Sequence, residues 1–133
     1  MQPSARCRVS KPLLATNGTE AMARLLYDTD VLIEHLEGSN PLPVGEDLAY
    51  SCISRTELYS LSAADEERID AFLDPLEEIE VGREVAQEAG RIRRATRIKL
   101  PDALLAAAAL STRRNLVTRN VKDFRKMTGL RLR

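Results

Sequence analysis

Short apolar segments alternate with segments of helical pattern along most of the chain, and this alternation restricts the fold more than any other feature. We expect strands at residues 24–27, 48–53, 79–81 and 116–118, with residues 130–132 as a candidate fifth strand. We expect helices at 29–36, from Ser54 to about residue 61, from Asp65 to about Pro75, at 83–98 and at 101–110. Alternating strands and helices are joined by right-handed crossovers into a parallel sheet. The sequence therefore predicts an α/β fold: a doubly wound sandwich whose central sheet has four to five mostly parallel strands and is flanked by helices.

The length of 133 residues fits one domain with a substantial core. Residues 1–21 contain Pro3, Pro12 and a turn-forming Asn-Gly pair but no periodicity, so we expect a disordered tail there and a single domain over residues 22–133. Met22 stands directly before the first strand, which suggests that the tail is an artefact of an upstream start and that the functional protein begins at Met22. Apolar runs are far shorter than the ~20 residues of a membrane helix, and the two cysteines form no metal or disulfide pattern. We therefore expect a cytoplasmic protein that does not bind membranes.

Four acidic residues follow the strands of the predicted sheet. Asp28 ends the first strand, Glu57 lies in the first turn of the helix after the second, and Asp102 lies in the first turn of the apolar helix 101–110. Asp123 follows the fourth strand. Ligands of an open parallel sheet bind outside the carboxyl ends of its strands, so topology should bring these acids to one rim. Carboxylates at close range repel one another, and a hard cation with oxygen ligands, Mg²⁺ or Mn²⁺, would offset that repulsion.

Each acid taken singly also has a structural explanation. The helix dipole favours negative charge in a first turn, which accounts for Glu57 and Asp102, and Asp30 is placed to cap or support the first helix. An acid that ends a buried strand, with a second acid two residues later, is harder to explain by capping. The pattern of all the acids together therefore favours a site, with Asp28 as its strongest member.

Four segments, in this order and spacing, resemble the PIN-domain nucleases and, more closely, the VapC-type toxins of bacterial toxin–antitoxin pairs. They are LLYDTDVLIEHLEG, SCISRTELYSL, KLPDALLAAAAL and NLVTRNVKDFRKMTGLRL. The resemblance runs from Met22 to the C-terminus. The first segment alone would also suit a haloacid-dehalogenase-like phosphatase, but LPDALL carries a single acid and the chain leaves no room for a cap domain.

The resemblance implies that Asp28, Glu57 and Asp102 are catalytic acids. The fourth catalytic position is open between Asp123, which we prefer, and its neighbour Asn120. Asp28 and Asp102 are expected to bind the metal directly. Glu57 and Asp123 would hold a second ion or position the attacking water.

Three further residues are expected to support the site: Asp30, Thr56 and Asn120. The site as a whole would hydrolyse RNA phosphodiester bonds with Mg²⁺, or with Mn²⁺ in its place. By resemblance, such an endoribonuclease toxin would inhibit translation and growth, be neutralised by a cognate VapB-type antitoxin and form a homodimer.

Charge is unevenly distributed although the formal net charge is zero. Residues 22–81 carry three basic and fifteen acidic side chains, whereas residues 82–133 carry fourteen basic and four acidic ones. A basic half suits a polyanion such as RNA, with transfer RNA as one candidate, although two halves that neutralise each other on folding explain the same numbers. The residues expected to bind RNA phosphates are Arg91, Arg94, Arg97, Arg119 and Lys122.

Two alternatives remain open at this point. A housekeeping RNA-processing nuclease would have the same fold and site. A catalytically silent PIN-fold binding module would have the fold without the activity, which the presence of all four acids argues against.

Overall fold

The computed structural model describes residues 23–38, 41–43 and 46–133, so the predicted tail at 1–21 lies outside the described residues. The strands are β1 (Arg24–Tyr27), β2 (Asp47–Ser51), β3 (Glu77–Ile79) and β4 (Asn115–Val117). The helices are α3 (Thr29–Glu37), α4 (Cys52–Tyr59), α5 (Glu66–Leu73), α6 (Arg83–Thr96), α7 (Leu100–Thr112) and α8 (Val121–Phe124). None of the helices in this part of the chain has the length and apolar character to span a bilayer.

In the described part of the chain, the sheet has four parallel strands in the order β3-β2-β1-β4. The expected fifth strand is reduced to one parallel bridge between Leu116 and Leu132. The Leu116 N–H donates to the Arg131 carbonyl at 2.8 Å, and the Arg133 N–H donates to the Leu116 carbonyl at 2.9 Å. The predicted α/β sandwich is confirmed, and the last residues extend its sheet beside β4.

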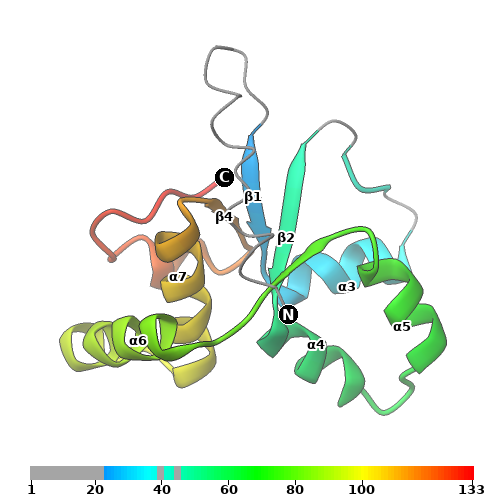
Figure 1. Ribbon diagram of the computed structural model, residues 1–133, viewed down its shortest axis with the longest axis horizontal. Helices are drawn as coiled ribbons and strands as arrows, with labels where there is room; N and C mark the ends of the chain where they lie inside the picture. The colour runs from blue at the N-terminus through cyan, green and yellow to red at the C-terminus, as the bar shows by residue number, and fades with distance from the viewer. Residues whose placement is uncertain (1–22, 39–40, 44–45) are drawn as a thin grey trace.

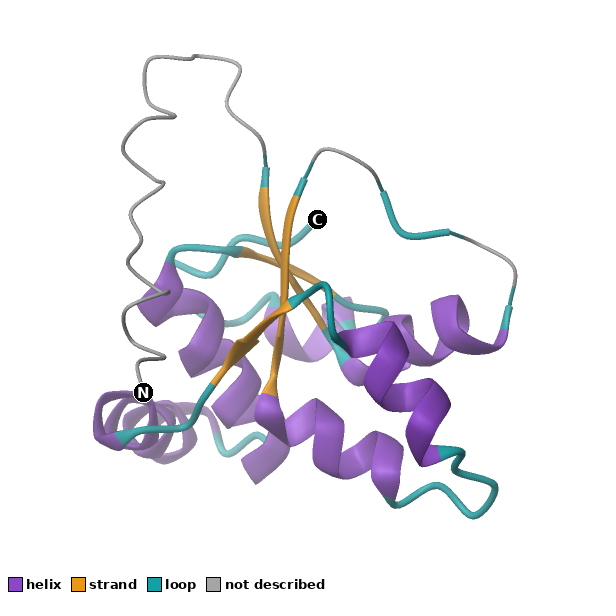
Figure 2. Cartoon of the chain, turned by 45° about the vertical axis from the view of Figure 1, so that its right-hand side comes forward, coloured by secondary structure: helices purple, strands orange, loops and turns teal. Residues whose placement is uncertain are grey.

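Helices cover both faces of the sheet. Figure 1 shows α6 and α7 on one side and α3, α4 and α5 on the other, and Figure 2 shows the strands between the two groups. Each face of the sheet has its own hydrophobic core, and alternate residues of β1 contribute to the two. Leu26 packs with α6 and α7, while Leu25 and Tyr27 pack on the opposite face. Residues 106–109 of α7 are alanines exposed by 1% or less, so this helix lies close against the sheet.

The start of α4 differs from the prediction. Ser54 was expected to cap the helix, but Ser51 does so, its hydroxyl accepting the Ile53 N–H at 3.1 Å. Ser54 is instead buried inside the helix. The apolar Ile53 imitates a continued strand, which explains the error. Glu57 consequently lies in the second turn of α4 and not in the first.

The third strand also differs, because it begins at Glu77 and ends at Ile79 instead of covering residues 79–81. Two consecutive acids are unusual in a partly buried strand, and partners distant in sequence stabilise them here. Glu77 accepts a hydrogen bond from Arg114 at 2.9 Å, and Glu78 accepts one from Arg55 at 3.0 Å.

Arg114 joins all four strands at their amino ends. Its side chain is 1% exposed and lies just before β4. One terminal nitrogen, Nη1, donates to the Asp47 carboxylate at 3.0 Å and to the Leu25 carbonyl at 3.3 Å, and Nη2 donates to Glu77. This buried guanidinium therefore links β4 to β1, β2 and β3.

Candidate active site

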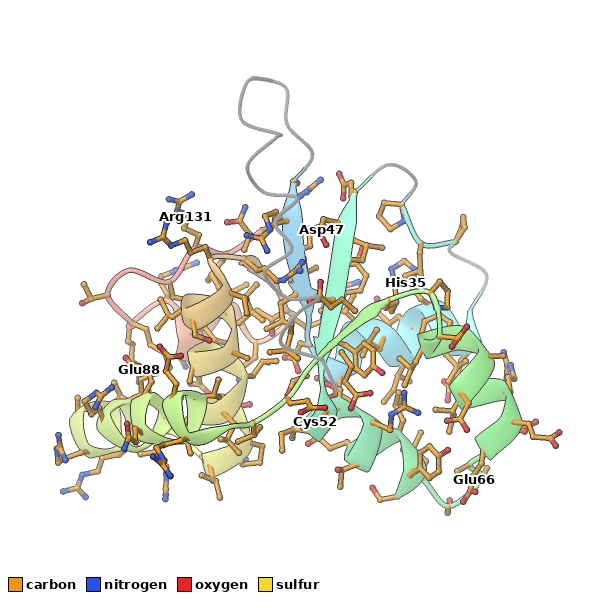
Figure 3. All side chains as sticks on the ribbon, viewed as in Figure 1. His35, Asp47, Cys52, Glu66, Glu88 and Arg131 are labelled. Atoms are coloured by element: carbon orange, nitrogen blue, oxygen red, sulfur yellow. The ribbon has the colours of Figure 1, made fainter. Side chains whose placement is uncertain are left out.

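A pocket of about 360 Å³ lies at the carboxyl ends of β1, β2 and β4. In Figure 3, Cys52 marks the carboxyl end of β2, opposite to Asp47 at its amino end. Five of the predicted site residues line the pocket: Asp28, Asp30, Glu57, Asp102 and Asn120. Its apolar lining consists of Ile33, Ile53, Leu61, Pro101 and Leu105. The pocket therefore combines carboxylates with apolar walls.

Asp28 is the N-cap residue of α3 and is held from two sides. Its Oδ1 accepts the Thr29 N–H at 2.6 Å, and its Oδ2 accepts the Thr118 hydroxyl at 2.7 Å. Burial raises the pKa of Asp28, the two hydrogen bonds lower it, and the nearby charges of Asp30 and Glu57 raise it further. Asp30 lies in the first turn of α3 and is exposed, so the capping role expected of Asp30 belongs to Asp28, for which the sequence had made capping a weak explanation.

Asp102 faces the same pocket from the first turn of α7. Burial raises the pKa of Asp102, and the charges of Asp28, Asp123 and Glu57 raise it as well, while Lys99 lowers it. The four acids, which are widely separated in sequence, thus share one electrostatic environment. Of the described residues that line the pocket, Lys99 alone is basic.

Glu57 is positioned by two hydroxyl groups that sequence reasoning missed. The Thr29 hydroxyl donates to the Glu57 carboxylate and shares a 2.8 Å hydrogen bond with the Ser54 hydroxyl. Thr56, the expected supporting residue, is exposed and donates to the Cys52 carbonyl at 3.4 Å, outside the pocket lining. The one signal in the sequence was helical spacing, since Ser54 and Glu57 are three residues apart on one helix face.

Asp123 does not line the pocket, whereas Asn120 does. The Asn120 side-chain amide donates to Asp123 Oδ2 at 3.1 Å, and the Asn120 backbone N–H donates to the Thr118 hydroxyl at 2.9 Å. Thr118 in turn donates to Asp28. A continuous chain of hydrogen bonds therefore runs from Asp28 to Asp123, with Asn120 as the member that reaches the pocket.

Within the described ranges, no three His, Cys, Asp or Glu side chains are grouped closely enough to hold a metal ion on their own. The donor set nevertheless fits a hard divalent cation. Mg²⁺ prefers oxygen ligands and is commonly bound by one or two carboxylates, with water and substrate phosphate in the other positions. Asp28 and Asp102 offer such oxygens, and their mutual repulsion is the feature that a cation would relieve.

The residues expected to bind RNA lie on the surface, and they differ in whether an acid already pairs with them. Arg91 pairs with Glu88 at 2.9 Å, and Arg119 forms an ion pair with Glu34. Three others are exposed and form no ion pair with any residue that the structure describes: Arg94, Arg97 and Lys122.

The comparisons with known proteins agree with this fold. The family model described as PIN domain matches residues 25–130. A chain of a toxin–antitoxin complex from Klebsiella pneumoniae is 28% identical, with a TM-score of 0.67, and the match covers 80% of this chain and 94% of that one. No curated protein matches the sequence.

Two further solved structures share the fold. A chain of DNA-bound VapBC from Salmonella typhimurium is 22% identical with a TM-score of 0.72, and the match covers 84% of this chain and 98% of that one. A chain of VapBC2 from Rickettsia felis, bound to a DNA fragment from its promoter, is 21% identical with a TM-score of 0.71, with coverages of 82% and 96%.

Proposed function

Because this chain belongs to the PIN domain family, whose members are generally nucleases, we propose that it is a metal-dependent endoribonuclease. We further propose that it is the VapC-type toxin of a toxin–antitoxin pair. The observation that carries the first proposal is that Asp28, Glu57 and Asp102, distant in sequence, line one pocket at the carboxyl ends of the parallel strands.

The proposed reaction is hydrolysis of an RNA phosphodiester bond. A divalent cation, Mg²⁺ or Mn²⁺, held by Asp28 and Asp102 would supply Lewis-acid stabilisation of the charge on the phosphate and acidify a bound water. Glu57, fixed by the Thr29 hydroxyl, is the carboxylate available to orient that water and accept its proton. Asn120 would direct its amide at the pocket while Asp123 holds its orientation.

An antitoxin is the partner that the pocket and the comparisons both support. The matched chains come from toxin–antitoxin and VapBC complexes. A peptide with an arginine or lysine between apolar residues would complement carboxylates surrounded by Ile33, Ile53 and Leu105. The proposal includes a homodimer, as in the sequence-based prediction, and action on cytoplasmic RNA, with transfer RNA as a candidate substrate.

Cleavage of total RNA tests the nuclease. Asp28→Asn and Asp102→Asn should each reduce the Mg²⁺-dependent cleavage rate by about two orders of magnitude or more, because each removes charge that would hold the cation. Asp74→Asn is the matched control, since Asp74 is an exposed carboxylate at the end of α5 and outside the pocket. Equal cleavage by all four proteins would refute the site, and cleavage that survives EDTA would refute the metal.

Expression in cells tests the toxin role. Induction of the wild-type gene alone should arrest growth, and co-expression of the adjacent antitoxin gene should restore it. The Asp102→Asn protein should be harmless in both cases. Normal growth on induction of a protein that cleaves RNA in vitro would favour the housekeeping nuclease. Absence of cleavage in vitro, with tight binding of the partner, would favour the silent binding module.

A further inference from the structure

A second pocket, of about 320 Å³, lies at the amino end of β4, whereas the acidic pocket lies at the carboxyl ends of the strands. It is formed by the end of α7, by residues 113–115 and by residues 129–131. Among the described residues, its charged lining consists of Arg113, Arg114 and Arg131, without an acid. We propose that this basic pocket binds a phosphate group.

The walls of the basic pocket are fixed by backbone hydrogen bonds. The Arg113 N–H donates to the Leu110 carbonyl at 3.2 Å, and the Arg114 N–H donates to the Ala109 carbonyl at 2.9 Å. These bonds satisfy carbonyls at the end of α7 that would otherwise repel an anion. On the opposite wall, the Arg131 carbonyl is paired with the Leu116 N–H of β4. The arginines therefore project from backbone whose position is set before any ligand arrives.

The basic pocket contains unused hydrogen-bond donors. Arg113 and Arg131 are exposed, and neither side chain forms a hydrogen bond or ion pair with any residue in the described ranges. Arg131 lies at the same end of the sheet as Asp47 (Figure 3). Exposed arginines elsewhere differ in one of two ways: Arg119 is already paired with Glu34, and Arg94 and Arg97 line neither pocket.

Arg114 lines the basic pocket from its buried side. Its side chain is 1% exposed, and its two terminal nitrogens are occupied by Asp47 and Glu77. Its Nε is buried and has no hydrogen-bond partner within the described part of the chain. Because this N–H is shielded from solvent, a phosphate in the pocket would act on it through electrostatic attraction and not through direct contact.

A phosphate group suits this set of donors. Guanidinium groups are planar and bind phosphate oxygens through two parallel hydrogen bonds, with stronger attraction than a neutral donor offers. Arg113 and Arg131, both exposed in the basic pocket, supply the guanidinium donors that one phosphate would bind. The group could belong to the backbone of an RNA or to free phosphate. The inference does not depend on the proposed cleavage reaction, because no residue of the basic pocket lines the acidic one.

The test is a binding titration of the full chain with inorganic phosphate at low salt, followed by NMR of the arginine Nε–H groups. The wild type should show saturable shifts that include the Arg114 Nε–H. The double variant Arg113→Gln/Arg131→Gln should bind phosphate at least about tenfold more weakly. Arg114 is left intact because its loss would disturb the sheet. The matched control is Arg125→Gln/Lys126→Gln, which removes two exposed charges outside the pocket and should change the dissociation constant by less than twofold.

A short oligoribonucleotide, titrated in EDTA to prevent cleavage, distinguishes the two sources of phosphate. Parallel weakening of RNA and phosphate binding in the pocket variant would identify the RNA backbone as the ligand. Weakened phosphate binding with unchanged RNA binding would identify free phosphate. The proposal is overturned if millimolar phosphate gives no saturable shifts, or if both double variants weaken binding equally.

Discussion

Replacing Arg114 with methionine should destabilise the fold more than any other change of a single charged side chain outside the acidic pocket. The substitution keeps most of the side-chain volume but removes every donor of the guanidinium. It leaves two carboxylates, Asp47 and Glu77, whose side chains are only 22% and 18% exposed, without their buried partner. The Leu25 and Asp47 carbonyls lose a donor as well.

The magnitude follows from the burial of the pair. Breaking a buried ion pair from one side costs about 3–5 kcal/mol, because an uncompensated charge remains in a poorly solvated place. The one-fifth exposure of the two carboxylates allows some hydration, so we expect about 3 kcal/mol. For a domain of this size, that loss lowers the melting temperature by roughly 10 °C or more. Arg24→Met is the matched control: Arg24 contacts the same Asp47 but is 31% exposed, so its loss should cost less than about 1 kcal/mol.

Urea unfolding followed by circular dichroism measures these differences, provided that the dependence on denaturant has the same slope in each protein. Adding Asp47→Asn and Glu77→Gln to Arg114→Met should restore at least about 1 kcal/mol, because neutral amides in that place repel less and need less solvation. The reasoning is refuted if Arg114→Met costs no more than Arg24→Met. It is also refuted if removing both acids restores nothing.

Three further outcomes are expected. Thr118→Val should lower RNA cleavage by about tenfold, and Thr118→Ser should restore it, because the hydroxyl that holds Asp28 is lost and then replaced. Ala106→Leu should destabilise the protein by about 1–3 kcal/mol in the same urea assay, since Ala106 is fully buried in the core that α7 shares with α6 and the sheet; an unchanged midpoint would contradict that close packing. Burial and the hydrogen bond to Glu78 raise the pKa of Tyr50 above its usual 10.0. Above pH 10 the phenol therefore stays neutral in the folded protein but ionises in the unfolded chain. The stabilisation by the neutral phenol is complete below pH 10 and is lost as the pH rises further. The free energy of unfolding should therefore fall more steeply above pH 10 in the wild type than in Tyr50→Phe, and identical pH profiles would exclude this linkage.

The regular part of the fold could be predicted because it depends on local patterns. Apolar strands between helices imply a parallel sheet, and a parallel sheet places the residues after its strands at one rim. That rule led from Asp28, Glu57 and Asp102 in the sequence to a shared rim, and all three line one pocket. Their catalytic role stays a prediction until the variants are assayed.

The remaining features depend on contacts between distant residues, which no local pattern contains. Arg114 was counted only as one of the fourteen basic residues of 82–133, but the carboxylates of Asp47 and Glu77 give it a buried place. The hydroxyls that hold the site acids were missed for the same reason. Thr29 follows Asp28 directly, yet its side chain serves Glu57, and only the packing of α3 against α4 shows this.

The strand order has a consequence for the timing of synthesis. The first strand, β1, lies between β2 and β4, and its register with β4 pairs Leu25 with Asn115. One edge of β1 therefore has no partner strand until β4 has been synthesised. Thr118 and Asn120, which complete one side of the acidic pocket, are added directly after β4. A nascent chain has no complete acidic pocket before its last quarter emerges, so during most of its synthesis the proposed nuclease lacks part of its site.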